Sequence, residues 1–145
     1  MYQGKKVRLR AFEPSDLEDN YRFVNDTDTA QHQWLSQQTS YTHGEYQFAV
    51  DNEEGKLVGR CGLTKIDWKN RSADAAIMIG KPYRGRGYGS DALRVLCAFS
   101  FQQMNVHHLK VSVLSCNEEA IRCYEACGFR REGVLREDVF RNGIY

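Results

Sequence analysis

Hydrophobic and polar residues alternate along much of the first half of the chain, as they do in strands that bury one face. Four segments carry this pattern, at 7–12, 46–50, 57–66 and 73–79. Polar turns at 51–55 and 69–71 separate the last three, so we expect consecutive antiparallel strands joined by hairpins. In the fourth segment, apolar residues on one face alternate with a mixed set on the other. The first set is Ala73, Ala75, Ile77 and Ile79, and the second is Asp74, Ala76 and Met78.

Apolar residues recur every three to four positions in three other segments, which predicts helices at 14–24, 90–104 and 118–127. Pro14 and Asp16 suit the first turn of the first helix, and Gly128 suits the end of the last. The segment 109–114 has the pattern of a short buried strand, parallel to the strand at 73–79 by the right-handed crossover rule. The order of elements therefore predicts an α/β fold, a mixed central sheet flanked by helices.

Composition adds limits to this picture. A chain of 145 residues suits a single domain over 1–145, and it can bury about 68 to 70% of its unfolded surface without disulfides or metals. No apolar run approaches the ~20 residues of a membrane span, and residues 1–6 lead into a strand rather than a signal peptide. The five cysteines show no Cys-x-x-Cys spacing and no zinc-like cluster. We therefore expect a cytoplasmic protein with reduced cysteines, no bound metal and no membrane partner.

The net charge of +1 hides an asymmetry along the chain. Residues 1–55 hold 5 Lys/Arg and 10 Asp/Glu, and residues 56–145 hold 15 and 9, so the two parts carry −5 and +6. This distribution suits an anionic cofactor that meets a cationic substrate, and it equally suits solvated faces on opposite sides of the domain. The basic residues are dispersed and form no recognition motif for nucleic acid, so we expect no such partner.

The strand at 73–79 runs into a loop in which glycines and arginines alternate, and this loop opens the helix at 90–104. Backbone N–H groups freed of side-chain bulk, next to the positive end of a helix, make a concave site for an anion. The expected phosphate-binding loop comprises Arg84, Gly85, Arg86, Gly87, Tyr88, Gly89 and Ser90. Its two arginines add guanidinium groups suited to phosphate oxygens. Glycines in such a connection can also serve only a tight turn.

Two familiar nucleotide-binding loops do not fit this segment. A Walker loop needs a lysine and then Ser or Thr directly after its last glycine, and no lysine follows Gly89. A dinucleotide fold needs an acidic residue about 20 positions after its glycines, where this chain has His107 and His108. The phosphate ligand is therefore of another kind.

The spacing Arg84-x-x-Gly87-x-Gly89 after a strand resembles the acetyl-coenzyme A pyrophosphate loop of the GCN5-related N-acetyltransferases, the GNAT family. A second, more specific pattern is independent of the first: Asn117-x-x-Ala120-x-x-x-Tyr124-x-x-x-Gly128-Phe129, followed by Glu132-Gly133-x-Leu135-Arg136-Glu137. With the N-terminal strand and helix start, the resemblance covers most of the chain. It is similar to the branch that contains ribosomal-protein N-terminal and spermidine acetyltransferases.

The resemblance implies that acetyl-CoA is the co-substrate and that acetyl passes directly to a primary amine, on a polyamine-like small molecule or a protein N-terminus. It places the acid that protonates the departing thiolate at Tyr124, which could otherwise be a core aromatic. It places an oxyanion-stabilising N–H near Met78 and Ile79, at a bulge of the strand. Asn117 would bond the pantetheine arm or cap a helix. Asp74 stands where relatives carry a glutamate base, and it could otherwise be a surface carboxylate.

Two departures from the family pattern concern its length. Asn142-Gly143 predicts a hairpin turn, but only Ile144 and Tyr145 follow, so we expect the last strand of the family fold to be missing or truncated. Between Val24 and Tyr46 there are 21 residues where relatives place a second helix, so the substrate side is abbreviated or lacks residues. An open sheet edge would favour a homodimer. The unsettled base and the missing strand leave one rival function, a non-catalytic module that senses acyl-CoA.

Overall fold

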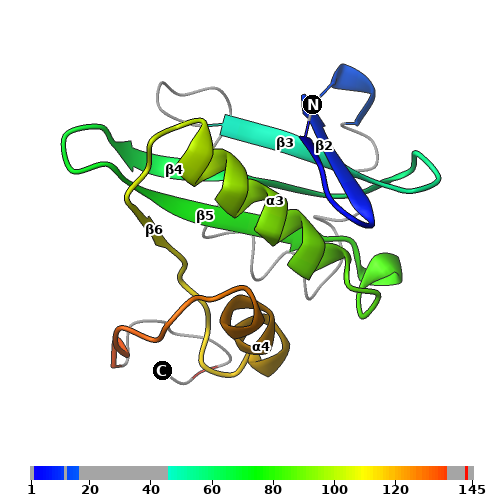
Figure 1. The fold of residues 1–145 in the computed structure, drawn as a ribbon. Helices are drawn as coiled ribbons and strands as arrows, with labels where there is room; N and C mark the ends of the chain where they lie inside the picture. The colour runs from blue at the N-terminus through cyan, green and yellow to red at the C-terminus, as the bar shows by residue number, and fades with distance from the viewer. Residues whose placement is uncertain (1, 12, 17–45, 137–142, 144–145) are drawn as a thin grey trace.

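The computed structural model describes residues 2–11, 13–16, 46–136 and Gly143, and its centre is one six-stranded sheet (Figure 1). The strands follow one another in space in chain order: β1 (Tyr2–Gln3), β2 (Val7–Ala11), β3 (Tyr46–Asn52), β4 (Leu57–Asp67), β5 (Ser72–Ile79) and β6 (His108–Lys110). Neighbouring strands are antiparallel except β5 and β6, which are parallel. The predicted mixed sheet and meander are confirmed, and β1 is an addition to them.

Within the described ranges, two α-helices and two short 3-10 helices accompany the sheet. They are η1 (Pro14–Asp16), η2 (Lys81–Tyr83), α3 (Tyr88–Gln102) and α4 (Glu118–Ala126). Helix α3 crosses one face of the sheet, and α4 lies beyond β6 (Figure 1). The helices predicted at 90–104 and 118–127 are thus confirmed. Only the first turn of the helix predicted at 14–24 is described, as η1, and the rest of that prediction lies outside the described residues.

The strand predicted at 109–114 is shorter and less buried than expected. It pairs with β5 only over three residues, from Ser72–His108 to Asp74–Lys110, and Leu109 is its half-buried member. Polar residues flank Leu109, and among the described strands only β5 adjoins β6, so the strand has little apolar surface to bury. After Lys110 the chain leaves the sheet toward α4 (Figure 1). No later strand is assigned among residues 111–136.

The core lies between the sheet and α3. Leu9, Val50 and Leu63 of the strands and Leu93 and Leu96 of the helix are completely buried. Burying one such side chain stabilises the fold by roughly 1.5–3 kcal/mol. This contact holds α3, and with it the loop that opens α3, in a defined position over the end of β5.

The two faces of β5 follow the predicted alternation. Ala73 and Ala75 are buried in the core under α3, and Ile77 and Ile79 pack against that core. Met78 lies on the other face, against Ala49 and Leu57. None of the helices in the described ranges combines the length and the apolar character that crossing a bilayer requires.

Candidate active site

The loop between β5 and α3 turns twice through left-handed backbone. Gly85 has φ +77° and Gly87 has φ +83°, a region that costs other L-residues roughly 1–2 kcal/mol. Gly87 is the residue directly before the first turn of α3. A Cβ built on Gly85 would touch nothing within 4 Å, whereas one on Gly87 would lie 3.1 Å from the ammonium of Lys6. The glycines are therefore required both for the path of the loop and for space beside it.

The N-terminus of α3 is open toward this loop. The first N–H groups of a helix have no acceptor within the helix. The N-cap residue of α3 is Gly87, and no side chain of the described residues caps this end of the helix. The N–H groups of Tyr88, Gly89 and Ser90 therefore add their dipoles to the positive end of α3. A pyrophosphate fits this donor set. The residues present thus suit the acyl-CoA loop that the sequence predicts.

Three side chains of the loop are anchored to the protein. The Tyr88 hydroxyl donates to Glu53 Oε1 at 3.2 Å, and Tyr88 is buried. Arg84 Nε donates to the carbonyl oxygen of Ile79 at 2.9 Å. Ser90 Oγ lies 3.3 Å from Cys123 Sγ of α4. These contacts shape the loop, so Tyr88 and Ser90 can offer an anion their backbone N–H groups.

Beyond Asp74, no described strand pairs with the free side of β5. Gly80 N–H donates to Val58 at 2.8 Å, and the alternation of antiparallel pairs then directs the backbone groups of Met78 toward β4 as well. The N–H groups of Ile77 and Ile79 point the opposite way, toward the side of β6. An extended ligand could therefore bond to β5 along this side.

The bulge predicted near Met78 and Ile79 is wrong. Pairing of β4 with β5 runs without a shift from Thr64–Asp74 to Gly59–Ile79, and the register shift of these strands lies between Thr64 and Asp67. In this regular pairing the Met78 N–H points toward β4. The Ile79 N–H points toward the open side of β5, where it can donate to a ligand. A regular ladder reaches the same result as a bulge because every second residue of a strand faces away from its partner.

Tyr124 projects from α4 into the partly buried layer that packs on the core. Its ring meets that of Phe129 at 6.0 Å between centroids, with planes inclined by 62°. Burial, with a smaller effect of the neighbouring Cys123, raises the pKa of the Tyr124 phenol above its usual value. Among the described residues its hydroxyl has no hydrogen-bond partner. The phenol is thus held in its protonated form, as an acid must be before it acts.

Asn117 and Asp74 each contact other residues of the protein, and these contacts give both a structural role. Asn117 Oδ1 accepts from the N–H of Ala120 at 3.2 Å, so this side chain caps α4. Asp74 lies 3.7 Å from the ammonium of Lys110 and 3.9 Å from that of Lys65. It projects to the face of the sheet opposite the α3 side, with Met78. The structure therefore does not bring Asp74 and Tyr124 together on one side of the sheet.

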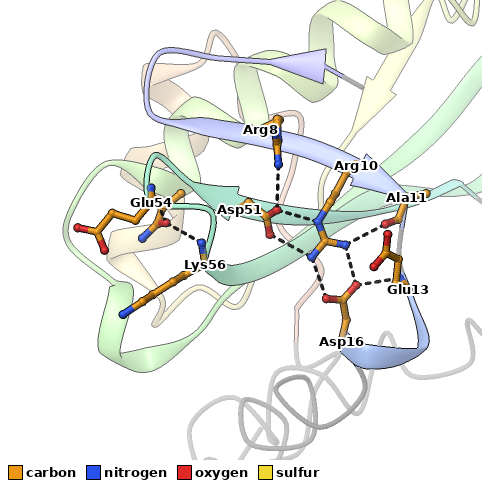
Figure 2. Close-up of polar contacts among 9 residues, drawn as sticks. Arg8, Arg10, Ala11, Glu13, Asp16, Asp51, Glu54 and Lys56 are labelled. Atoms are coloured by element: carbon orange, nitrogen blue, oxygen red, sulfur yellow. Dashed lines mark hydrogen bonds and ion pairs between the residues drawn. The ribbon is translucent and has the colours of Figure 1, made fainter.

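Part of the predicted acidic surface is neutralised inside the fold (Figure 2). Arg10 donates to both carboxylate oxygens of Asp16, each at 2.8 Å, and to both of Asp51, at 2.7 and 3.1 Å. Arg8 approaches Asp51 at 3.7 Å. Both carboxylates are buried, so neither is available to a cationic substrate. The acidic residues at 17–45 lie outside the described residues.

The sequence did not predict that the turn carrying Lys6 contacts the loop at 84–90. The carboxylate of Asp91, in the first turn of α3, accepts the N–H groups of Lys5, Lys6 and Val7 at 3.1, 2.6 and 3.0 Å. The ammonium of Lys6 in turn donates to the carbonyl of Arg86 at 3.0 Å. The only sequence feature that pointed to this contact was an acidic residue shortly after the glycines. Such a residue does not indicate which groups it contacts. Within the described ranges, no group of three or more metal-ligating side chains is arranged to hold a metal.

The family model for the acetyltransferase (GNAT) domain matches residues 6–130. The chain is 32% identical to the spermidine N(1)-acetyltransferase of Vibrio cholerae serotype O1 over 72% of its length and 61% of the relative's. It is 27% identical to that of Escherichia coli K12, over 100% and 84%. It is also 28% identical to a putative ribosomal N-acetyltransferase of Bacillus subtilis, over 63% and 50%.

Solved structures resemble the whole chain. A chimera of the Vibrio cholerae spermidine N-acetyltransferase SpeG and hSSAT superposes with a TM-score of 0.83 at 28% identity, over 96% of this chain and 89% of that one. The dodecameric spermidine N-acetyltransferase from Vibrio cholerae superposes with a TM-score of 0.80 at 28% identity, over 96% and 88%. The fold and the loop thus define an acetyl-CoA-dependent N-acetyltransferase. The chain belongs to the GNAT family, whose enzymes use acetyl-CoA as co-substrate.

Proposed function

We propose that this protein transfers an acetyl group directly from acetyl-CoA to a primary amine of a polyamine-type small molecule. The observation that carries the proposal is the open N-terminus of α3 behind the left-handed Gly85 and Gly87, in a chain similar to spermidine acetyltransferases over nearly its whole length. The acceptor is the finer part of the proposal. It is supported by the relatives and by the excess of acidic residues in the first 55 positions.

Acetyl-CoA, when bound, supplies the thioester and the thiolate leaving group. The N–H groups of Tyr88, Gly89 and Ser90 hold the pyrophosphate, with Arg84 and Arg86 at the same loop. The N–H groups of Ile77 and Ile79 hold the extended arm, and that of Ile79 lies where charge on a carbonyl oxygen can be stabilised. Asn117 supports this arrangement as the cap of α4.

Two proton transfers complete the chemistry. Tyr124 holds a proton at its hydroxyl for the leaving thiolate, on the α3 side of the sheet. Asp74 accepts the amine proton through a water molecule, from the opposite face. Its carboxylate lies within ion-pair distance of Lys65 and Lys110.

A coenzyme-release assay with a panel of acceptors tests this function. We expect turnover with spermidine and spermine, and weaker turnover with short monoamines and with peptides that carry a free N-terminus. Turnover with the peptides alone would replace the polyamine by a protein N-terminus. Acetyl-CoA binding without turnover of any amine would favour the rival function, a module that senses acyl-CoA.

Three other expectations stay predictions. They are the single domain over 1–145, the cytoplasmic location and the homodimer. The dodecameric state of the Vibrio cholerae protein is a further reason to measure the assembly of this chain by sedimentation.

A further inference from the structure

We propose that Lys6, on the turn between β1 and β2, is a further phosphate-binding residue of the acetyl-CoA site, and that Asp91 is the residue that positions it. This inference rests on the proposed function, since it assigns a ligand to the loop at 84–90. The two residues lie 85 positions apart in the chain, and the sequence pattern of the loop includes neither of them as a phosphate ligand.

Lys6 reaches the side of the loop on which Gly87 has no side chain. Its ammonium lies 3.1 Å from the position that a Cβ of Gly87 would occupy, and it donates to the carbonyl of Arg86 at 3.0 Å. An ammonium carries three N–H donors, and this contact uses one of them. Two donors and a full positive charge therefore remain at the loop for the oxygens of a phosphate.

The turn that carries Lys6 is fixed by Asp91. Three consecutive N–H groups, from Lys5 to Val7, converge on the Asp91 carboxylate, which is buried. A Cβ on Gly4 would lie 2.5 Å from the same carboxylate, so this approach requires glycine. Because its oxygens already accept these three bonds, the Asp91 charge is satisfied within the protein. The carboxylate can thus hold the turn at the phosphate loop without presenting unpaired negative charge to the ligand.

Lys5 provides a contrast within the same turn. The side chains of Lys5 and Lys6 are both exposed, but the Lys5 ammonium makes no hydrogen bond or ion pair with any residue in the described ranges. The specific feature of Lys6 is therefore its placement at the loop, and not the presence of basic residues near the N-terminus.

Calorimetric titration with coenzyme A tests the inference without turnover. We expect Lys6→Met to raise the Kd for coenzyme A about tenfold, since a charge-assisted hydrogen bond is lost. Lys6→Arg should restore most of the affinity, and Lys5→Met should raise the Kd less than twofold. Lys69→Met, in the distant turn between β4 and β5, serves as the charge control and should bind as the wild type does. An equal loss in Lys5→Met and Lys6→Met would show a general charge effect and overturn the inference.

Salt dependence and a second ligand distinguish phosphate binding by Lys6 from a purely structural contact with the loop. The slope of log Kd against log salt concentration should be smaller in Lys6→Met than in the wild type, because one cationic contact to phosphate is gone. Dephospho-coenzyme A, which keeps the pyrophosphate, should lose affinity by the same factor in Lys6→Met. An unchanged salt slope together with a lowered Tm would reduce Lys6 to a staple of the loop. A loss seen only with coenzyme A would place the contact at the 3′-phosphate and overturn the assignment to the pyrophosphate loop.

A double-mutant cycle tests the role of Asp91. Asp91→Asn should weaken coenzyme A binding in the wild-type background, and it should have no further effect on Kd in the Lys6→Met background. A full additional loss would show that Asp91 acts otherwise than through Lys6. If the wild-type protein itself fails to bind coenzyme A, the proposed function fails; if the wild type binds and Lys6→Met binds equally well, only the present inference fails.

Discussion

The hydroxyl of Ser90 and the thiol of Cys123 lie 3.3 Å apart, and they join the first turn of α3 to the middle of α4. A second contact repeats the connection, because Cys127 Sγ donates to the carbonyl of Ser90 at 3.5 Å. Tyr124 follows Cys123 directly, so the proposed acid is held at a set distance from the proposed phosphate loop. The two cysteines therefore have a packing role that their helical spacing alone did not indicate.

The first prediction concerns Tyr124. Tyr124→Phe keeps the ring that packs against Phe129 and removes the proton donor. We expect kcat to fall by about 10²- to 10⁴-fold, with the Kd for coenzyme A nearly unchanged. Because the pKa of the phenol is raised, the wild-type kcat should fall only above about pH 10, and this limb should flatten or move in the variant. Tyr2→Phe is the control, because it removes a hydroxyl at the other end of the sheet and keeps the ring contact with Phe99. Near-normal kcat with a lowered Tm would make Tyr124 a core aromatic.

The second prediction tests the phosphate loop. Acetyl-CoA should raise the Tm of the wild type, and neither ATP nor NAD should do so. Gly87→Asp should abolish the shift, because it places a carboxylate at the loop and strains a left-handed position. Gly55→Asp is a matched control, since Gly55 has φ +78° in the β3–β4 turn, outside the loop at 84–90, with nothing within 4 Å of its built Cβ. It should lower the Tm and leave the response to acetyl-CoA intact. Equal stabilisation of wild type and Gly87→Asp would reject the loop as the binding site.

The third prediction separates two roles of Asp74. If its carboxylate is the base, Asp74→Asn should lower kcat by about 10²-fold. If it serves only the ion pairs with Lys65 and Lys110, activity should persist with a stability change below about 1 kcal/mol. Measuring kcat from pH 5 to 10 beside a urea titration distinguishes these outcomes. We expect the first outcome.

The fourth prediction concerns the ion pairs of Arg10. Arg10→Met leaves the buried carboxylates of Asp16 and Asp51 without this cation, so we expect a loss of about 3 kcal/mol in the free energy of unfolding. Arg8→Met is the control: its guanidinium is 43% exposed and lies 3.7 Å from Asp51, so its loss should cost under about 1 kcal/mol. If urea denaturation shows the same loss of unfolding free energy in Arg10→Met and Arg8→Met, the paired hydrogen bonds of Arg10 add no stability beyond that of an exposed ion pair.

The same variant has a consequence at low pH. Hydrogen bonds from Arg10 lower the pKa of Asp16 below its usual value. The resulting stability is present above the unfolded pKa of about 3.9, and it is lost as pH falls through the lowered folded value. The unfolding free energy of the wild type should therefore fall below pH 4, whereas Arg10→Met should have lost this contribution already at pH 7. Identical pH dependence in the two proteins would contradict the pairing.

The fifth prediction concerns substrate attraction. If the acidic first third recruits the amine, raising the salt concentration should raise the KM for spermidine more than the KM for a monoamine. The effect must come from residues other than Asp16 and Asp51, because both are buried and paired with Arg10. Identical salt responses would leave the charge asymmetry without a role in binding.

The sequence by itself predicted most of the described strands and helices, and it singled out the loop that we propose to bind phosphate. Alternation at 73–79 and helical spacing at 90–104 are local, so they predict β5 and α3 without knowledge of any partner. The glycines at 85 and 87 likewise indicate a left-handed backbone conformation, which other residues rarely adopt. The length of the strand at 109–114 was overestimated, because the burial of a strand depends on neighbours that its own residues do not reveal.

Only the tertiary structure decided what surrounds that loop. The contact of Lys6 with Arg86, and the three N–H groups on Asp91, join positions at least 80 residues apart in the chain. The register of β4 with β5 decided that the Ile79 N–H faces outward and the Met78 N–H does not. Such contacts depend on how the sheet aligns and where α3 docks on it. They are cooperative properties of the packed core, and a local pattern of residues carries no record of them.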